Sequence, residues 1–165
     1  MSVGSTKSEV VAPVLLCFDG SEDAAAAIAK AGRVLSARPA VVLAVWEPVR
    51  AWAAYDPATI ISAPLAKLVS EELGLDALAE DLAREDTERG LVLARDAGFE
   101  ATSRVACGKA WPKICEVAEE LDVELIVVGA RGLGRVESAL LGGVSAAVVA
   151  HAKRPVLVVP AHGGD

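Results

Sequence analysis

The sequence predicts an α/β protein built on a doubly wound, five-stranded parallel sheet, an open α/β sandwich. Short apolar runs rich in β-branched residues alternate with segments of helical periodicity. Strands that are apolar throughout are typical of parallel sheets with helices on both faces. Hydrophobic residues make up 53% of the chain but aromatic residues only 4%, so the core must consist mainly of Ala, Val, Leu and Ile.

The elements follow from the order of these patterns along the chain. Strands are expected at five apolar runs, 14–18, 41–46, 99–107, 125–128 and 156–159. Helices are expected at 21–35, 65–97, 111–121 and 144–152. Ser21 is a suitable N-cap for the first helix, Gly98 is a suitable residue to end the second, and Pro112 suits the first turn of the third.

The length of the chain and the positions of its proline and glycine residues predict the domain organisation. At 165 residues the chain fits one domain, expected at 12–161, with a flexible N-terminus at 1–11 and a flexible tail at 162–165. Three prolines, Trp52 and Tyr55 fall within 48–64, which predicts a long loop that acts as a lid or binding loop or is disordered. Gly74 and Gly90 leave open whether 65–97 is one helix.

Composition excludes several classes of protein. The formal net charge of −7 argues against a general nucleic-acid binder. No stretch approaches the ~20 apolar residues of a membrane span, and we expect a soluble, cytoplasmic protein. The cysteines, Cys17, Cys107 and Cys115, form no C-x-x-C pair, which favours small buried side chains in a reducing compartment over zinc or disulfides. His151 and His162 have no nucleophile in a recognisable motif, so we expect them to be structural or surface residues.

A glycine-rich segment after the fourth predicted strand carries the strongest functional signal. The apolar run 125–128 leads directly into Gly129, Gly132 and Gly134, and Gly142 and Gly143 precede the last helix. Glycines at the end of a strand let a ligand approach the main chain, and several N–H groups that point one way bind phosphate. The segment therefore predicts an anion site, although a plain turn would use the same residues.

These residues resemble the universal stress protein family, which is related to the nucleotide-binding α-hydrolases. The family motif G-x2-G-x9-G matches Gly129, Gly132 and Gly142, and 14–21 resembles the opening strand with its acidic residue. The likeness spans about 14–160. It implies the adenine nucleotide alpha hydrolase-like fold with strand order 3-2-1-4-5, and it implies an adenine nucleotide as ligand: ATP, AMP or cAMP, with Mg²⁺ as a candidate companion ion.

The resemblance also assigns individual residues to the nucleotide site. It implies that Asp19 contacts the ribose and that the backbone of Val45 contacts adenine. Arg131 and Arg135 flank the glycines and could reach phosphate oxygens. The expected phosphate contacts are Gly129, Arg131, Gly132, Gly142, Gly143, Val144 and Ser145.

One residue departs from the family pattern. The position after Gly142 is Ser or Thr in the motif but Gly143 here. The missing hydroxyl would weaken triphosphate binding by about 1.5 to 3 kcal/mol, or roughly 10- to 150-fold. Ser145, two residues further on, is a candidate for partial replacement.

Two functions remain open from the sequence. The first is a stress-response module that binds an adenine nucleotide and regulates partners. The alternative is a nucleotide-free homodimeric interaction module of the same family. No catalytic residue is assigned, and hydrolysis of ATP would at most be slow. A phosphoacceptor receiver domain is excluded because Asp19 lacks an acidic neighbour. Apolar Val156, Leu157, Val158 and Val159 predict an edge strand through which the chain forms a homodimer.

Overall fold

The five expected strands all form and lie in one parallel sheet. A computed structural model of the chain describes residues 11–35, 38–48, 63–130 and 141–160. The strands are β1 (Val14–Cys17), β2 (Pro39–Trp46), β3 (Glu100–Cys107), β4 (Leu125–Gly129) and β5 (Val156–Val159). Their spatial order is β3-β2-β1-β4-β5. The predicted fold class and strand order are confirmed.

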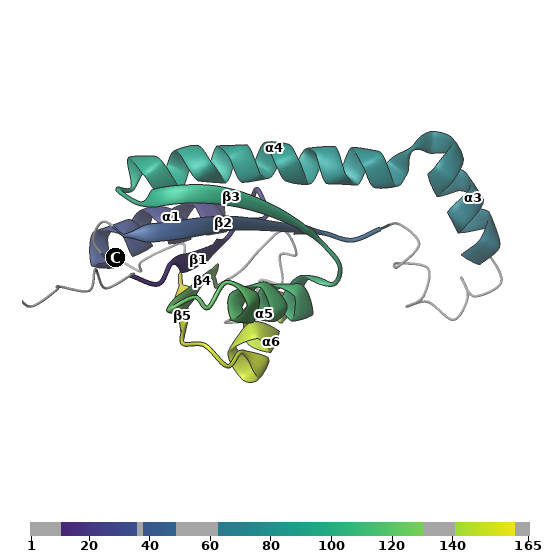
Figure 1. The fold of residues 1–165 in the computed structure, drawn as a ribbon. Coiled ribbons are helices and arrows are strands. Elements are labelled where there is room, and N and C mark those ends of the chain that lie inside the picture. The colour runs from purple at the N-terminus through teal and green to yellow at the C-terminus, as the bar shows by residue number, and fades with distance from the viewer. Residues whose placement is uncertain (1–10, 36–37, 49–62, 131–140, 161–165) are drawn as a thin grey trace, which may run out of the picture.

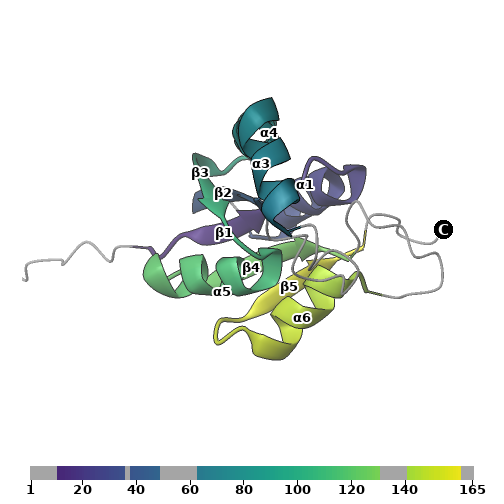
Figure 2. The ribbon, with the colours of Figure 1, turned by 90° about the vertical axis from the view of Figure 1, so that its right-hand side faces the viewer.

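Helices cover both faces of this sheet, as Figures 1 and 2 show. On one face, α1 (Glu22–Leu35) packs on β4 and β5, and α4 (Leu75–Asp96) packs on β2 and β3. On the other face lie α5 (Ala110–Glu120) and α6 (Gly143–His151), which pack on each other. The core is therefore divided by the sheet into two apolar clusters.

The central strand β1 belongs to both clusters. Val14 and Leu16 face α1, Leu15 faces α5, and all three are 0% exposed. β1 pairs with β2 on one side and β4 on the other. This complete burial explains why the strand has no polar residue before Asp19.

The expected signals at helix ends are confirmed for α1 and α4. The Ser21 hydroxyl accepts the N–H of Ala24 at 3.1 Å, which caps α1, and Glu22 and Asp23 occupy its first turn. Gly98 has a positive φ of 93° directly after α4. Pro112 lies in the first turn of α5, where its missing N–H costs no hydrogen bond.

The two uncertain glycines of the long helical segment behave differently. Gly74 has φ +61° and separates α3 (Ala63–Leu73) from α4, because a left-handed residue interrupts a right-handed helix. Gly90 lies within α4, where a Cβ would lie 2.8 Å from Val42 Cγ1 and 2.9 Å from Phe18 Cδ1. Because Gly90 has no side chain, α4 can lie close to the sheet at this position.

Several expectations lie outside the described residues. Trp52, Tyr55 and most of the predicted loop are among them, as are 1–10 and the tail 161–165. The end of the predicted loop, Ala63 and Pro64, is instead the start of α3. Among the described residues, no helix combines the length and the apolar character that a membrane span requires.

We expect Gly90→Ala to lower the free energy of unfolding by up to about 2 kcal/mol. Alanine normally stabilises a helix by about 1 kcal/mol relative to glycine. Here the added methyl group overpacks against fully buried Val42, at a cost of about 1 to 3 kcal/mol. Urea unfolding measures the change, and exposed Val92→Ala is the control, with less than about 0.5 kcal/mol expected. A Gly90→Ala protein that is more stable would contradict this packing.

Candidate functional site

The chain reverses direction across the sheet between β1 and β4. It passes from β1 to β2 and β3, then returns to β4 and β5 on the other side of β1. In open parallel sheets, ligands bind beyond the carboxyl ends of the strands at this switch point. Asp19 follows β1, and Gly129 ends β4, the neighbour of β1. The structure therefore brings both sequence-predicted residues to one region.

Asp19 closes the turn that follows β1. One of its carboxylate oxygens, Oδ1, accepts the backbone N–H of Ser21 at 3.1 Å and the Ser21 hydroxyl at 2.5 Å. The same hydroxyl caps α1. Asp19 is exposed, so this structural role leaves its carboxylate at the protein surface beside the end of β1.

The backbone of Val45 lies where β2 extends beyond β1. Leu43 is the last residue of β2 in register with β1, and its carbonyl accepts the N–H of Phe18 at 2.9 Å. Main-chain groups two residues apart in a strand point to the same side. The N–H and C=O of Val45 therefore point to the space beyond the end of β1. The Val45 side chain is partly buried against the core, so any contact to a ligand would come from the backbone.

Hydrogen bonds hold the start of α6 against the end of β4. The hydroxyl of Ser145, which is 6% exposed, donates to the carbonyl of Gly129 at 2.7 Å. The N–H of Gly142 donates to the carbonyl of Ala130 at 2.7 Å. Both ends of the glycine-rich segment are thus fixed by bonds within the protein. The backbone acceptor Ala130 has no recognisable sequence signal, because a carbonyl is present in every residue.

The first turn of α6 presents backbone N–H groups without a side-chain cap. Gly142 is the N-cap residue and makes no side-chain hydrogen bond, and the first turn contains no acidic residue. An α-helix provides no acceptor for its first N–H groups, here those of Gly143, Val144 and Ser145. By contrast, the N–H of Ala110 at the start of α5 is bound by the Glu47 carboxylate at 3.3 Å. Gly143 is open: an added Cβ would meet nothing within 4 Å.

Arg131, Gly132, Gly134 and Arg135 lie outside the described residues. The predicted site residues that the structure describes are Asp19, Val45, Gly129, Gly142, Gly143, Val144 and Ser145. Among the described residues, no three His, Cys, Asp or Glu side chains are grouped as ligands of a metal ion.

The three cysteines are free: Cys17 and Cys115 are partly buried, and Cys107 is exposed. Burial, together with nearby Cys115 and Asp19, raises the pKa of the Cys17 thiol above its usual range. Burial also raises the pKa of Cys115. Both therefore stay protonated and unreactive near neutral pH. Cys107 is exposed, so the expectation of three buried cysteines is wrong: β3 is an edge strand, and its end is not covered.

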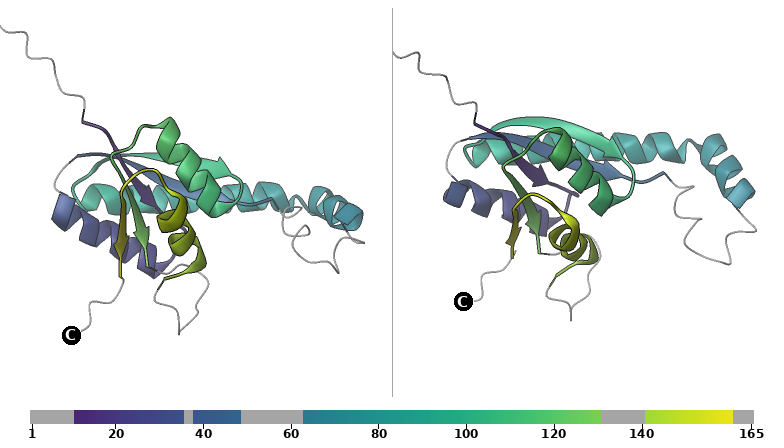
Figure 3. Two further views of the ribbon diagram at one scale, coloured as in Figure 1. Left: turned by 90° about the horizontal axis from the view of Figure 1, so that it is seen from below. Right: turned by 60° about the horizontal axis from the view of Figure 1, so that its bottom comes forward.

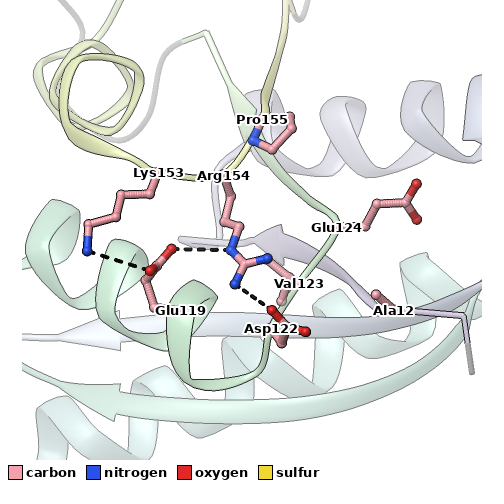
Figure 4. Close-up of a pocket in the computed structure, with 8 residues that line it drawn as sticks. All are labelled: Ala12, Glu119, Asp122, Val123, Glu124, Lys153, Arg154 and Pro155. Atoms are coloured by element: carbon pink, nitrogen blue, oxygen red, sulfur yellow. Dashed lines mark hydrogen bonds and ion pairs between the residues drawn. The ribbon is translucent and has the colours of Figure 1, made fainter.

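A hollow among the described residues lies at the opposite end of the sheet. It has a volume of about 570 Å³ and lies beside Pro155, which precedes β5 (Figure 4). Arg154 bridges Asp122 at 2.5 Å and Glu119 at 3.2 Å there, and Lys153 lies 3.7 Å from Glu119. The cations are thus already paired with carboxylates, and the hollow is broadly open to solvent. It lies at the amino ends of β4 and β5, away from the switch point.

The strand order and the flanking helices together define a doubly wound, open α/β protein. The model of the universal stress protein family matches residues 11–160. A universal stress protein of Thermus aquaticus, encoded beside a QAH/OAS sulfhydrylase gene, is 32% identical over 148 residues, which cover 88% of this chain and 96% of the relative. The chain belongs to the universal stress protein family.

Solved structures of the family share the fold. The universal stress protein UspA from Lactobacillus plantarum matches with a TM-score of 0.61 at 24% identity, over 90% of this chain and 98% of that protein. A universal stress protein family protein from Arabidopsis thaliana with AMP bound matches with a TM-score of 0.58 at 18% identity, over 90% of each chain.

Proposed function

We propose that this universal stress protein binds an adenine nucleotide at the carboxyl edge of β1, β2 and β4. The observation that carries the proposal is the uncapped N-terminus of α6, which lies directly beyond Gly129 at the switch point. Its first N–H groups, which have no acceptor within the helix, and the positive end of the helix dipole suit a phosphate. In the sequence, Gly129, Gly132 and Gly142 match the G-x2-G-x9-G motif, and Arg131 is the proposed cationic contact of the phosphate.

The nucleoside would lie across the ends of β1 and β2. The N–H and C=O of Val45 suit the hydrogen-bonding edge of adenine, which has both acceptors and a donor. The Asp19 carboxylate suits ribose hydroxyls, because an ionised carboxylate only accepts hydrogen bonds. The similar Arabidopsis protein has AMP bound, which supports a ligand of this class.

The part of the proposed site that would contact phosphate, at the start of α6, favours a nucleoside monophosphate over ATP. The position expected to carry a hydroxyl is Gly143. Ser145 does not replace it in this structure, because its hydroxyl is buried and donates to Gly129. We therefore propose AMP or cAMP as the tighter ligands and ATP with Mg²⁺ as the weaker one. The protein would act by binding rather than turnover, with the nucleotide favouring the conformation that partners recognise. Its three free cysteines fit the cytoplasm as the proposed compartment.

We expect Gly143→Pro to weaken AMP binding by about 10- to 150-fold, and Gly143→Ala to leave it unchanged. Proline is well tolerated at the first position of a helix, and Gly142 already has the extended backbone (φ −66°, ψ 156°) that precedes proline. The change therefore removes one N–H donor with little effect on the fold. Native mass spectrometry of the purified protein and calorimetric titration with AMP, cAMP and ATP measure binding. A wild-type protein that binds none of them would favour the nucleotide-free module instead.

We expect Gly143→Ser to strengthen ATP binding about tenfold or more and to change AMP binding little. The serine Cβ fits without a clash, and its hydroxyl can bond a distal phosphate oxygen that AMP lacks. The ratio of the two dissociation constants is the measurement. An equal change for both nucleotides would show that the hydroxyl does not reach the distal phosphates.

We also propose a homodimer through β5. Among the described residues this strand pairs only with β4, and no other described strand lies on its outer edge. Val156, Leu157 and Val158 remain partly exposed. The opposite edge strand, β3, is different, because Glu100, Thr102 and Ser103 are exposed and polar. Polar residues discourage pairing of sheet edges, whereas an apolar edge favours it.

Val158→Lys should convert the dimer to a monomer, because two lysines would meet across the paired edges. Thr102→Lys on the β3 edge is the matched control and should leave the dimer intact. Light scattering coupled to size-exclusion chromatography measures the mass, and circular dichroism confirms that the monomer is folded. A folded Val158→Lys dimer would place the interface elsewhere.

A further inference from the structure

A helical arm extends beyond the sheet. We define the arm as α3 and the first part of α4, residues 63–88. Figures 1 and 3 show α4 running past the ends of the strands, with α3 lying at its far end. The residues of α4 that are buried form one stripe, Ala83, Thr87, Gly90 and Ala94. No residue from 75 to 82 is buried. This half of α4 therefore extends beyond the sheet, and no layer of described residues buries it.

The arm exposes large apolar side chains. Leu68, Leu73, Leu78 and Leu82 are 53–67% exposed. Leu78 and Leu82 are one turn apart and therefore lie side by side on the same face of α4. Single exposed leucines are common on protein surfaces. Four exposed leucines within 15 residues, on a segment that packs on no other described layer, are typical of a surface that binds another molecule.

The arm also carries most of the net charge of the protein. It contains eight carboxylates and only two basic side chains, Lys67 and Arg84, a net charge of −6 in a chain whose net charge is −7. Lys67 and Arg84 are already paired with Glu71 and Glu80. Four of the carboxylates make no ion pair with any described residue: Glu72, Asp81, Glu85 and Glu88. The leucines are thus bordered by carboxylates without counter-charges.

The negative charge of the arm indicates which class of molecule could bind there. Nucleic acids and anionic membranes have the same sign as the arm and would be repelled. A second copy of the chain would bring two surfaces of −6 together. Among the described residues, the carboxylates are not grouped as metal ligands. A cationic apolar segment is the class that satisfies both the leucines and the carboxylates.

We propose that the arm is a docking surface for a cationic amphipathic helix of a partner protein. Leu78 and Leu82 would contact the apolar face of that helix. Asp81 and Glu85, each three residues after one of these leucines, lie next to them on the helix surface and would pair with its Lys or Arg side chains. Residues 75–88 span about 21 Å, which matches a partner helix of about 14 residues. This docking surface is made of other residues than the proposed nucleotide site, and the proposal does not rest on nucleotide binding.

The probe is an amidated 18-residue peptide of Leu and Lys with a leucine every three to four residues. The control peptide has Glu in place of every Lys. With the full chain, we expect saturable, salt-dependent binding of the Lys peptide by fluorescence anisotropy, and no binding of the Glu peptide. Hydrogen exchange should show protection centred on residues 68–88. Protection elsewhere, or none, would overturn the proposal.

Two double substitutions distinguish binding at the arm from nonspecific attraction of the Lys peptide to an acidic protein. Leu78→Ser with Leu82→Ser should weaken binding about tenfold or more at unchanged net charge. The matched control, Val34→Ser with Val149→Ser, removes exposed apolar side chains outside the arm and should have no effect. Asp81→Lys with Glu85→Lys should weaken binding of the Lys peptide and allow binding of the Glu peptide. All these side chains are exposed, and unchanged melting temperatures would confirm folding. Wild-type affinity in both arm variants would overturn the proposal.

Discussion

The rest of the structure depends on the burial of β1 from both sides and on both faces. Val14, Leu15 and Leu16 reach zero exposure because α1 lies on one face and α5 on the other, and the backbone of β1 is satisfied because β2 and β4 pair with it. A strand of four residues cannot meet these demands alone. The chain must therefore pass to one side of β1 and later return to the other, which creates the switch point at its carboxyl end.

At that switch point, the polar side chains of Asp19, Ser21 and Ser145 already make hydrogen bonds within the protein. Asp19 and Ser21 close the turn before α1, and Ser145 fixes α6 to the end of β4. What remains for a ligand is mainly backbone: the first N–H groups of α6 and the main chain of Val45. A site made of backbone groups needs glycine nearby because side chains would block the approach. This explains why the functional signal in the sequence consists of glycines rather than of catalytic side chains.

Features that depend on residues within one helix or strand could be predicted from the sequence, whereas features that depend on tertiary contacts could not. The apolar runs located all five strands, and Ser21 and Gly98 marked helix ends correctly. Nothing in the sequence around Gly74 and Gly90 distinguishes the glycine that breaks a helix from the one that packs on Phe18 and Val42. The exposure of Cys107 follows from the position of β3 at the sheet edge. The internal acceptors Gly129 and Ala130 are carbonyls, which sequence does not single out.

The arm and the switch point are connected by one close contact. A Cβ at Gly20, in the turn that contains Asp19, would lie 2.7 Å from the Asp86 carboxylate of α4. Asp86 lies between Ala83 and Thr87, at the point where α4 begins to contact the sheet. The turn beside the proposed nucleotide site thus packs against the base of the arm, and Gly20 places no side chain between them. Because coupling between two binding sites is reciprocal, a nucleotide and a partner that both acted on this contact would affect each other's binding.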